Sequence, residues 1–172
     1  MHKGVILLAG PTASGKSAVA IALAQQLEGV GGGVIINADS MQVYEELEII
    51  TAQPSPAEKK QVPHKLYGVL SGAERCSVAR WRDMAVAEIE AAHKLGQWPI
   101  LVGGTGLYFK VLQEGIAEVP QIPQSVTDDM AAHFAAIGAD AFYAELAGRD
   151  PEGAAKVGAT DTQRVLRLGA VL

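Results

Sequence analysis

The sequence predicts an α/β fold in which helices flank a parallel β-sheet. Short, continuously apolar runs, which are typical of strands buried on both faces, occur at residues 5–9, 34–36 and 99–102. Helical stretches separate these runs, so the order along the chain is strand, helix, strand, helix, strand. Because parallel strands require such crossovers, and the crossovers are almost always right-handed, we expect a parallel sheet.

The elements follow from local patterns. The first helix is expected over residues 16–27, which are rich in alanine and contain neither glycine nor proline, and the glycines at 31–33 end it. Residues 51–64 contain three prolines and are expected to form a loop. A longer helix is expected after Ser77, a favourable N-cap residue, because apolar residues recur every three or four positions up to Leu95.

The character of the chain changes after Gly115. Prolines punctuate short, alanine-rich helical segments in residues 116–158, which we expect to form a small helical insert or lid. Asp161 is then expected to cap a last helix. We therefore divide the chain into a P-loop catalytic core at 1–115, the insert at 116–158 and a return helix of the core at 159–172.

Composition and charge narrow the class of protein. The chain has 172 residues, of which 49% are hydrophobic and 19% charged, enough for one globular domain with a sizeable core. Its net charge of −5 differs from that of a basic nucleic-acid module. Cys76 is the only cysteine, which excludes an intramolecular disulfide and fits a reducing compartment. No apolar run approaches the about 20 residues of a membrane helix, so we expect no binding to a membrane. We also expect the protein to be a cytoplasmic monomer.

A glycine-rich motif directly follows the first apolar run and opens the first helix. It comprises Gly10, Pro11, Thr12, Ala13, Ser14, Gly15, Lys16 and Ser17, and it matches the P-loop pattern at every position. In this pattern backbone N–H groups and the helix N-terminus hold phosphate oxygens, and the lysine adds a positive charge. The serine hydroxyl is a ligand of the kind that Mg²⁺ prefers. We therefore predict a P-loop NTPase-like sheet, phosphate binding at residues 10–17 and Mg²⁺ on Ser17.

Polar residues also follow the other two predicted strands, at the edge of the sheet where ligands gather. The carboxylate of Asp39 can hold Mg²⁺, accept a proton or cap the next segment. The hydroxyl of Thr105 can bind a phosphate oxygen or make a local backbone bond. Arg164 and Arg167 share a face of the last helix, which is either a binding face or a solvated basic face. None of the four histidines has the ligand spacing of a structural zinc site.

Taken together, the motifs resemble those of the tRNA dimethylallyltransferase (tRNA isopentenyltransferase) family. The matching segments are residues 10–17, 37–44, 51–54, 63–64, 77–78, 101–108, 150–151 and 161–167, so the resemblance covers the whole chain. The most specific are Asp39-Ser40-Met41-Gln42 and Gly103-Gly104-Thr105-Gly106-Leu107-Tyr108. Family members are longer, so the chain resembles a C-terminally truncated form. The chain departs from the family's pattern at three positions. The family often has a histidine or arginine at the position of Lys65, an aspartate at that of Gly68 and an arginine near that of Thr127.

The resemblance implies a prenyltransferase that moves a dimethylallyl group from dimethylallyl diphosphate to the N6 amine of the adenosine beside the tRNA anticodon. Asp39, as the base, and Thr105 are implied to be catalytic, and Arg164 joins residues 10–17 in binding the diphosphate or a nucleotide such as ATP. The residues implied to bind tRNA are Asp39, Ser40, Met41, Gln42, Gln163, Arg164, Val165, Leu166 and Arg167. Mg²⁺ is the implied cofactor, and dimethylallyl diphosphate and the anticodon stem-loop are the implied partners.

The residues alone leave three alternatives open. An adenylate isopentenyltransferase acting on a free nucleotide shares these motifs. A P-loop small-molecule kinase usually needs an arginine-bearing lid, and turnover of ATP would favour it. A nucleotide-dependent binding module would bind RNA in response to an effector without chemistry.

Overall fold

The computed structural model of the chain describes residues 4–116 and 122–172. Its internal contacts divide it into two compact units, Met1–Ala117 and Glu118–Leu172. The first residues of the predicted insert include 117–121, which lie outside the described residues. Within the two described ranges, no helix combines the length and the apolar character that crossing a membrane requires.

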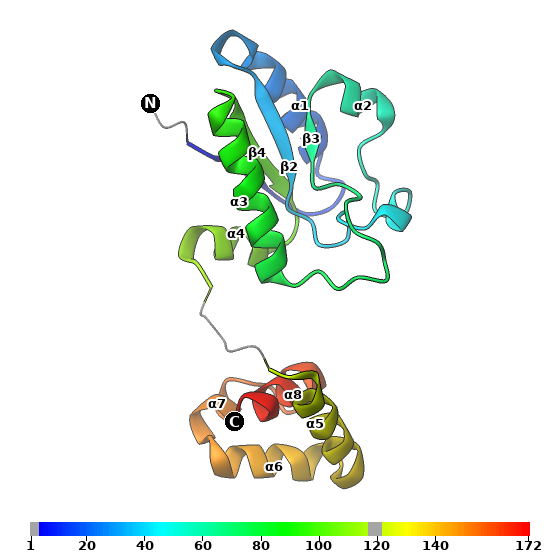
Figure 1. Cartoon of the computed structure of the whole chain (residues 1–172), viewed down its shortest axis with the longest axis vertical. Coiled ribbons are helices and arrows are strands. Elements are labelled where there is room, and N and C mark those ends of the chain that lie inside the picture. The colour runs from blue at the N-terminus through cyan, green and yellow to red at the C-terminus, as the bar shows by residue number, and fades with distance from the viewer. Residues whose placement is uncertain (1–3, 117–121) are drawn as a thin grey trace. The chain divides into compact units, whose positions relative to one another are not determined.

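A four-stranded sheet forms the centre of the first unit (Figure 1). Its strands are β1 (Ile6–Ala9), β2 (Gly33–Asn37), β3 (His64–Lys65) and β4 (Trp98–Gly103). They lie in the order β1-β4-β2-β3 and every pairing is parallel, which confirms the predicted parallel sheet. Strand β3 was not predicted, because a strand of two residues is too short to produce a hydrophobic pattern.

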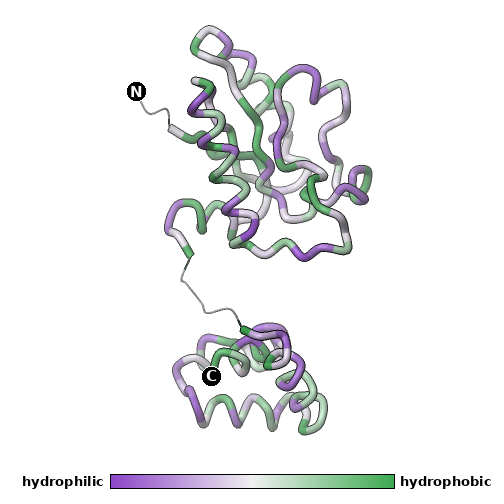
Figure 2. Tube along the Cα trace, in the orientation of Figure 1, coloured by the Kyte–Doolittle hydropathy of each residue, from purple (hydrophilic) through white to green (hydrophobic). Residues whose placement is uncertain are grey.

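Helices cover both faces of this sheet. They are α1 (Lys16–Gln26), α3 (Val78–Lys94) and α4 (Gly106–Glu114), and two short 3₁₀ turns, η1 (Glu28–Val30) and η2 (Glu45–Leu47), lie in the connections. Ile35 packs with residues of α1, whereas its neighbour Ile36 packs with Trp81 of α3. Adjacent strand residues therefore enter opposite cores, as the alternation of side chains in a strand requires. Figure 2 shows the middle of β2 as hydrophobic and α3 as mixed.

Residues 51–64 are not the loop that their prolines suggested. They contain α2 (Pro56–Gln61), which begins with Pro56 in its first turn. The hydroxyl of Ser55 accepts a hydrogen bond from the N–H of Glu58, and the Glu58 carboxylate accepts one of 2.8 Å from the N–H of Ser55. This reciprocal pair is a capping box, and proline is well tolerated at the start of a helix, so the prediction of a loop was wrong.

The second unit consists of helices: α5 (Gln124–Ile137), α6 (Ala139–Arg149), α7 (Pro151–Ala155) and α8 (Thr162–Val171). Phe142, Leu146 and Val165 form its buried core. The carboxylate of Asp161 accepts a hydrogen bond from the N–H of Arg164, which confirms the predicted cap of the last helix. The division into insert and return helix stays a prediction.

Candidate functional site

The segments that follow β1, β2 and β4 are joined by backbone hydrogen bonds at one edge of the sheet. The N–H of Gly10, directly after β1, donates to the carbonyl oxygen of Gly103 over 3.3 Å. Ala38, directly after β2, donates to Val102 over 2.8 Å and accepts from the N–H of Thr105 over 3.2 Å. The parallel strands thus end together, and the P-loop, Asp39 and Thr105 come from neighbouring segments.

Two glycines, the last residue of β4 and the residue that follows it, allow this close approach. A Cβ atom on Gly103 would lie only 2.0 Å from the carbonyl oxygen of Ala38, a distance that no side chain tolerates. A Cβ on Gly104 would lie 3.4 Å from the carbonyl oxygen of Gly10 and 3.7 Å from Oδ2 of Asp39. Gly104 therefore borders both the start of the P-loop and the Asp39 carboxylate, which places these two groups near one another.

The P-loop itself has the backbone of an anion site. Gly15, the N-cap of α1, has φ +82°, and Ala13 has φ +62°, in a region that alanine rarely adopts. Among the described residues, the backbone N–H groups of residues 12–17 donate no hydrogen bond to another protein group. Nζ of Lys16 contacts the carbonyl oxygen of Pro11 and lies 3.4 Å from Oγ of Ser14. The loop thus presents N–H donors, a helix N-terminus and an ammonium group together, the combination that binds phosphate.

The two carboxylate oxygens of Asp39 have different surroundings. Oδ1 accepts a hydrogen bond of 2.9 Å from the N–H of Met41, so the capping interpretation is confirmed for this oxygen. Oδ2 has no hydrogen-bond partner in the described part of the chain and lies beside Gly104. One oxygen holds the turn after β2, and the other remains available for a ligand or a proton.

The Thr105 hydroxyl makes a long-range hydrogen bond, and not the local hydrogen bond to the backbone that was the alternative prediction. Its Oγ1 accepts from the N–H of Ser40 over 2.9 Å and lies 3.4 Å from the Ser40 hydroxyl. Although Thr105 is the N-cap of α4, its side chain makes no capping bond. Thr105 therefore links the turn after β4 to the turn that carries Asp39.

A buried asparagine, for which no role was predicted, supports this turn. Asn37, the last residue of β2, is fully buried. Its Oδ1 accepts from the N–H of Asp39 over 2.8 Å, and its Nδ2 donates to the carbonyl oxygens of Asp39 and Leu66 over 2.9 and 3.0 Å. Its own carbonyl oxygen accepts a hydrogen bond of 3.0 Å from Nε1 of Trp81. An asparagine ending an apolar run was the available signal, since buried polar side chains need partners.

Three aromatic residues adjoin this region. The buried Trp81 ring stacks on Tyr108, with ring centroids 3.9 Å apart and an interplanar angle of 10°. Burial, and secondarily the charge of Asp39, raises the pKa of Tyr67 far above its usual value, so this phenol stays protonated near the carboxylate. Burial likewise raises the pKa of Tyr108.

The segment after Asp39 is held by amide side chains. Nε2 of Gln42 donates to the carbonyl oxygen of Thr51 over 2.7 Å and to that of Ala52 over 3.3 Å. Nε2 of Gln53 donates to Tyr44 over 2.8 Å in the same segment. Gln42, predicted to bind tRNA, therefore also stabilises the loop between β2 and α2, and tRNA binding by this residue stays a prediction.

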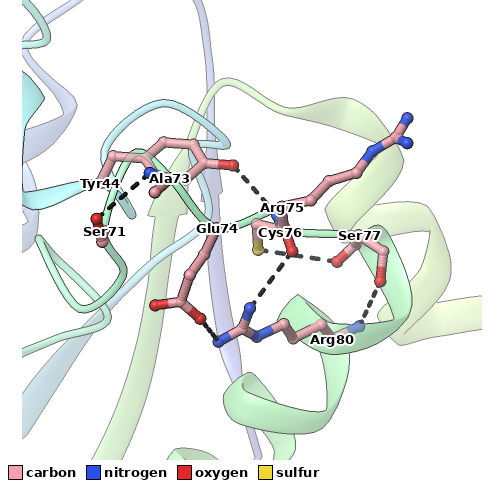
Figure 3. A network of polar contacts seen from close by, with 8 residues as sticks. All are labelled: Tyr44, Ser71, Ala73, Glu74, Arg75, Cys76, Ser77 and Arg80. Atoms are coloured by element: carbon pink, nitrogen blue, oxygen red, sulfur yellow. Dashed lines mark hydrogen bonds and ion pairs between the residues drawn. The ribbon is translucent and has the colours of Figure 1, made fainter.

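The loop before α3 is tied to the same region (Figure 3). The hydroxyl of Tyr44 accepts a hydrogen bond of 3.2 Å from the N–H of Cys76. The carboxylate of Glu46 accepts from Oγ of Ser71 over 3.0 Å and from the N–H of Gly72 over 2.7 Å. Backbone N–H groups, including those of Glu46 itself and Gly72, lower the pKa of this exposed carboxyl.

Figure 3 also shows how α3 begins. The hydroxyl of Ser77 caps the helix by accepting from the N–H of Arg80 over 3.1 Å, as the sequence predicted. The Arg80 guanidinium is 2.6 Å from the Glu74 carboxylate. Side-chain contacts thus order residues 71–80 at the start of the helix that carries Trp81.

The predicted ligand residues on α8 belong to the second unit. Gln163, Arg164 and Arg167 are exposed there, and Nε of Arg164 lies 3.3 Å from the Asp161 carboxylate. Val165 is 1% exposed and belongs to the core of this unit, so its side chain is not available to tRNA. Binding of the diphosphate or tRNA by α8 stays a prediction.

The chain is similar to known proteins along most of its length. The family model described as IPP transferase matches residues 42–172, and the one described as isopentenyl transferase matches residues 3–68. The chain is 51% identical over 168 residues to the tRNA dimethylallyltransferase of Rhodospirillum centenum, covering 98% of this chain and 52% of the relative. It is 51% identical over 167 residues to that of a Methylobacterium species, covering 97% of this chain and 53% of the relative.

Solved structures give the same result. A eukaryotic dimethylallyltransferase acting on tRNA matches with a TM-score of 0.79 and 32% identity, covering 96% of this chain and 40% of that protein. The full-length tRNA isopentenylpyrophosphate transferase of Bacillus halodurans matches with a TM-score of 0.62 and 33% identity, covering 98% of this chain and 54% of that protein. The chain spans about half the length of the curated relatives it matches. Its family models, its relatives and its P-loop architecture lead to one conclusion: this chain belongs to the IPP transferase family.

Proposed function

We propose that this chain carries the catalytic site of an enzyme that transfers a dimethylallyl group from dimethylallyl diphosphate to the N6 amine of the adenosine adjacent to the tRNA anticodon. The observation that supports this most directly is the approach of Asp39 to the start of the P-loop across Gly104. A proton acceptor thereby lies beside a phosphate-binding loop, as the reaction requires.

The diphosphate occupies the P-loop in this proposal. The N–H groups of residues 12–17, the positive end of α1 and the ammonium group of Lys16 all favour an anion. As the allylic C–O bond breaks, its electron pair goes to the diphosphate, and these groups stabilise the growing charge. The hydroxyl of Thr105 and the guanidinium of Arg164 are further proposed donors.

The adenine amine is the nucleophile. The target base leaves its stack to reach the site, as enzymes acting on nucleobases generally require. Its exocyclic nitrogen attacks the allylic carbon and forms the new C–N bond, which would leave a positive charge on the nitrogen. Asp39 accepts the proton through Oδ2, the oxygen that the Met41 N–H does not occupy.

Mg²⁺ is part of the proposal. The exposed hydroxyl of Ser17, in the first turn of α1, would hold the ion together with diphosphate oxygens. Mg²⁺ in phosphate sites is usually held by one or two protein oxygens together with the substrate's phosphates. When bound, the ion would neutralise charge on the diphosphate.

The proposed tRNA contacts lie on two segments. Ser40, Met41 and Gln42 follow the proposed base directly, and Met41 is 51% exposed. Gln163, Arg164 and Arg167 offer polar and cationic groups on α8, with Leu166 between them. We propose that the protein acts as a monomer in the cytoplasm.

Transfer of labelled dimethylallyl groups tests this function. The assay uses this chain continued by the remaining half of the Rhodospirillum centenum relative, termed the extended protein below. Three separate reactions are run with Mg²⁺ and dimethylallyl diphosphate. The first contains an anticodon stem-loop, the second contains free AMP, and the third contains ATP together with a phosphate acceptor. Prenylated stem-loop adenosine is expected. Prenylated AMP alone would show a free-nucleotide enzyme, and phosphorylated acceptor a kinase.

A further inference from the structure

We infer that Asn37 is a positioning residue for the reaction: its buried amide sets the orientation of Asp39, so that Oδ2 of Asp39 faces the phosphate-binding loop. The inference rests on the proposed function, because it assumes that Asp39 accepts the proton. It concerns a side chain that touches neither proposed substrate and acts only through its neighbour.

The amide holds both backbone polar groups of Asp39. Oδ1 of Asn37 accepts from the N–H of Asp39, and Nδ2 donates to the carbonyl oxygen of the same residue. The two bonds, of 2.8 and 2.9 Å, restrain rotation of the backbone on both sides of the Asp39 Cα atom. The direction in which the carboxylate leaves the backbone is thereby set by Asn37.

The remaining freedom of the carboxylate is restricted by Met41. Its N–H binds Oδ1 of Asp39 over 2.9 Å, which limits rotation of the side chain. Oδ2 is then directed toward Gly104, next to the carbonyl oxygen of Gly10 at the start of the P-loop. Asn37 and Met41 together therefore leave a single carboxylate oxygen for the proton.

Asn37 is itself held on two further sides. Its second Nδ2 bond reaches the carbonyl oxygen of Leu66, directly after β3, where the backbone has φ +63°. Trp81 of the opposing helix donates its Nε1–H to the Asn37 carbonyl oxygen. Asn37 is also the only fully buried polar residue of the described chain, so water does not compete for these bonds.

The chemistry of the amide suits this position. It accepts one hydrogen bond and donates two without carrying a charge, and all three are made here. An aspartate of the same shape would place a second carboxylate beside Asp39 and lose both donors when ionised. An alanine would leave the N–H and the carbonyl oxygen of Asp39, and the carbonyl oxygen of Leu66, without this partner.

A double-mutant cycle in the extended protein tests the inference. The variants are Asn37→Ala, Asp39→Asn and the two combined, with Ile35→Val as a control on the same strand, since Ile35 is equally buried but packs toward α1. Stability is measured by urea unfolding, inorganic diphosphate affinity by calorimetry, and kcat and KM with dimethylallyl diphosphate and a stem-loop.

Asn37→Ala is expected to lower kcat about 10- to 100-fold, the usual effect of a small misplacement of a catalytic group. KM and diphosphate affinity should stay within about twofold of the parent. In the Asp39→Asn background the same substitution should cost little more, because Asn37 acts through Asp39. The control should keep its full kcat.

Each other result overturns the inference in its own way. In one outcome, Asp39→Asn is slow, and Asn37→Ala lowers kcat by the same factor whether residue 39 is Asp or Asn. Asn37 would then act independently of Asp39, so the present inference would fail while the proposed function would stand. If Asp39→Asn is fully active, the base assignment of the proposed function fails as well. Should Asn37→Ala not fold, the cycle is run with Asn37→Ser, which keeps an oxygen able to accept from the Asp39 N–H, and the same criteria apply.

Discussion

The backbone N–H of Ser40 donates a hydrogen bond of 2.9 Å to Oγ1 of Thr105, which lies 65 residues further along the chain. This bond joins the turn after β2 to the turn after β4. A second hydrogen bond joins the same two turns, because the N–H of Thr105 donates to the carbonyl oxygen of Ala38 over 3.2 Å. Two turns distant in sequence thus form one surface beside the P-loop.

The first prediction concerns diphosphate binding. Lys16→Ala should abolish binding of inorganic diphosphate with Mg²⁺, because it removes the ammonium group from the anion site. The fold should be unaffected, since this side chain contacts only the loop itself. Lys94→Ala is the matched control. This exposed lysine ends α3 just before β4 starts, whereas the P-loop lies at the edge where the strands end. Calorimetry that finds equal affinity in both variants would disprove the phosphate assignment.

The second prediction concerns the base. Asp39→Asn should fold normally, because an amide oxygen can still accept from the N–H of Met41. The extended protein with this change should bind both substrates but lose roughly 10²- to 10⁴-fold in rate, the usual contribution of a general base. Asp83→Asn, an exposed change on α3, serves as the control. A near-normal rate for Asp39→Asn would reduce this residue to a cap or a metal contact.

The third prediction concerns the close contact between the backbones of Gly103 and Ala38. Gly103→Ala should destabilise the first unit by about 4 kcal/mol or prevent folding, since its Cβ would overlap the backbone of Ala38. Gly106→Ala, three residues on, should change stability little or raise it, because nothing lies within 4 Å of a Cβ there and the residue opens α4. Urea unfolding of both variants is the measurement, and equal stabilities would contradict the contact.

The fourth prediction concerns pH. Burial lowers the pKa of His64 below its usual value of 6.5, although the Val62 carbonyl oxygen partly opposes this shift. As the pH falls through 6.5, the unfolded chain therefore takes up a proton before the folded chain does. Stability should be fully present above that pH and decline until folded His64 is protonated as well. Urea unfolding between pH 5 and 8 should show a shallower decline for His64→Gln, and identical slopes would refute the assignment.

The fifth prediction concerns tRNA. The chain carries a net charge of −5, and its cations after residue 100 are Lys110, Arg149, Lys156, Arg164 and Arg167. Two of them, Lys110 and Arg164, already lie beside acidic partners. This chain should therefore bind an anticodon stem-loop weakly, whereas the extended protein should bind tightly and lose affinity more steeply with salt.

Filter binding at several salt concentrations compares the two proteins. If this chain alone matches the affinity and the salt slope of the extended protein, the arginines of α8 must be the main contact. Arg164→Ala combined with Arg167→Ala would then remove binding.

Local patterns predicted strands β1, β2 and β4, helices α1, α3 and α8, and the P-loop, because each depends on neighbouring residues. They did not predict α2, since the prolines of residues 51–64 outweighed the capping box of Ser55 and Glu58. The rule that parallel strands end together brought Asp39 and Thr105 to one edge. The role of Asn37 could not be predicted from local patterns or strand order. Its hydrogen-bond partner Leu66 follows β3, a strand that is too short to be predicted.

The pairing of β1 has a consequence for synthesis of the chain. Among the described strands β1 pairs only with β4, so that Ile6 meets Ile100. At about 5–20 residues per second, the strand that precedes the P-loop emerges from the ribosome roughly 5–20 s before its partner has been made. During that interval an apolar segment with unpaired backbone groups is open to chaperones and to aggregation. The phosphate-binding loop is therefore completed late in folding, after the central strand has arrived.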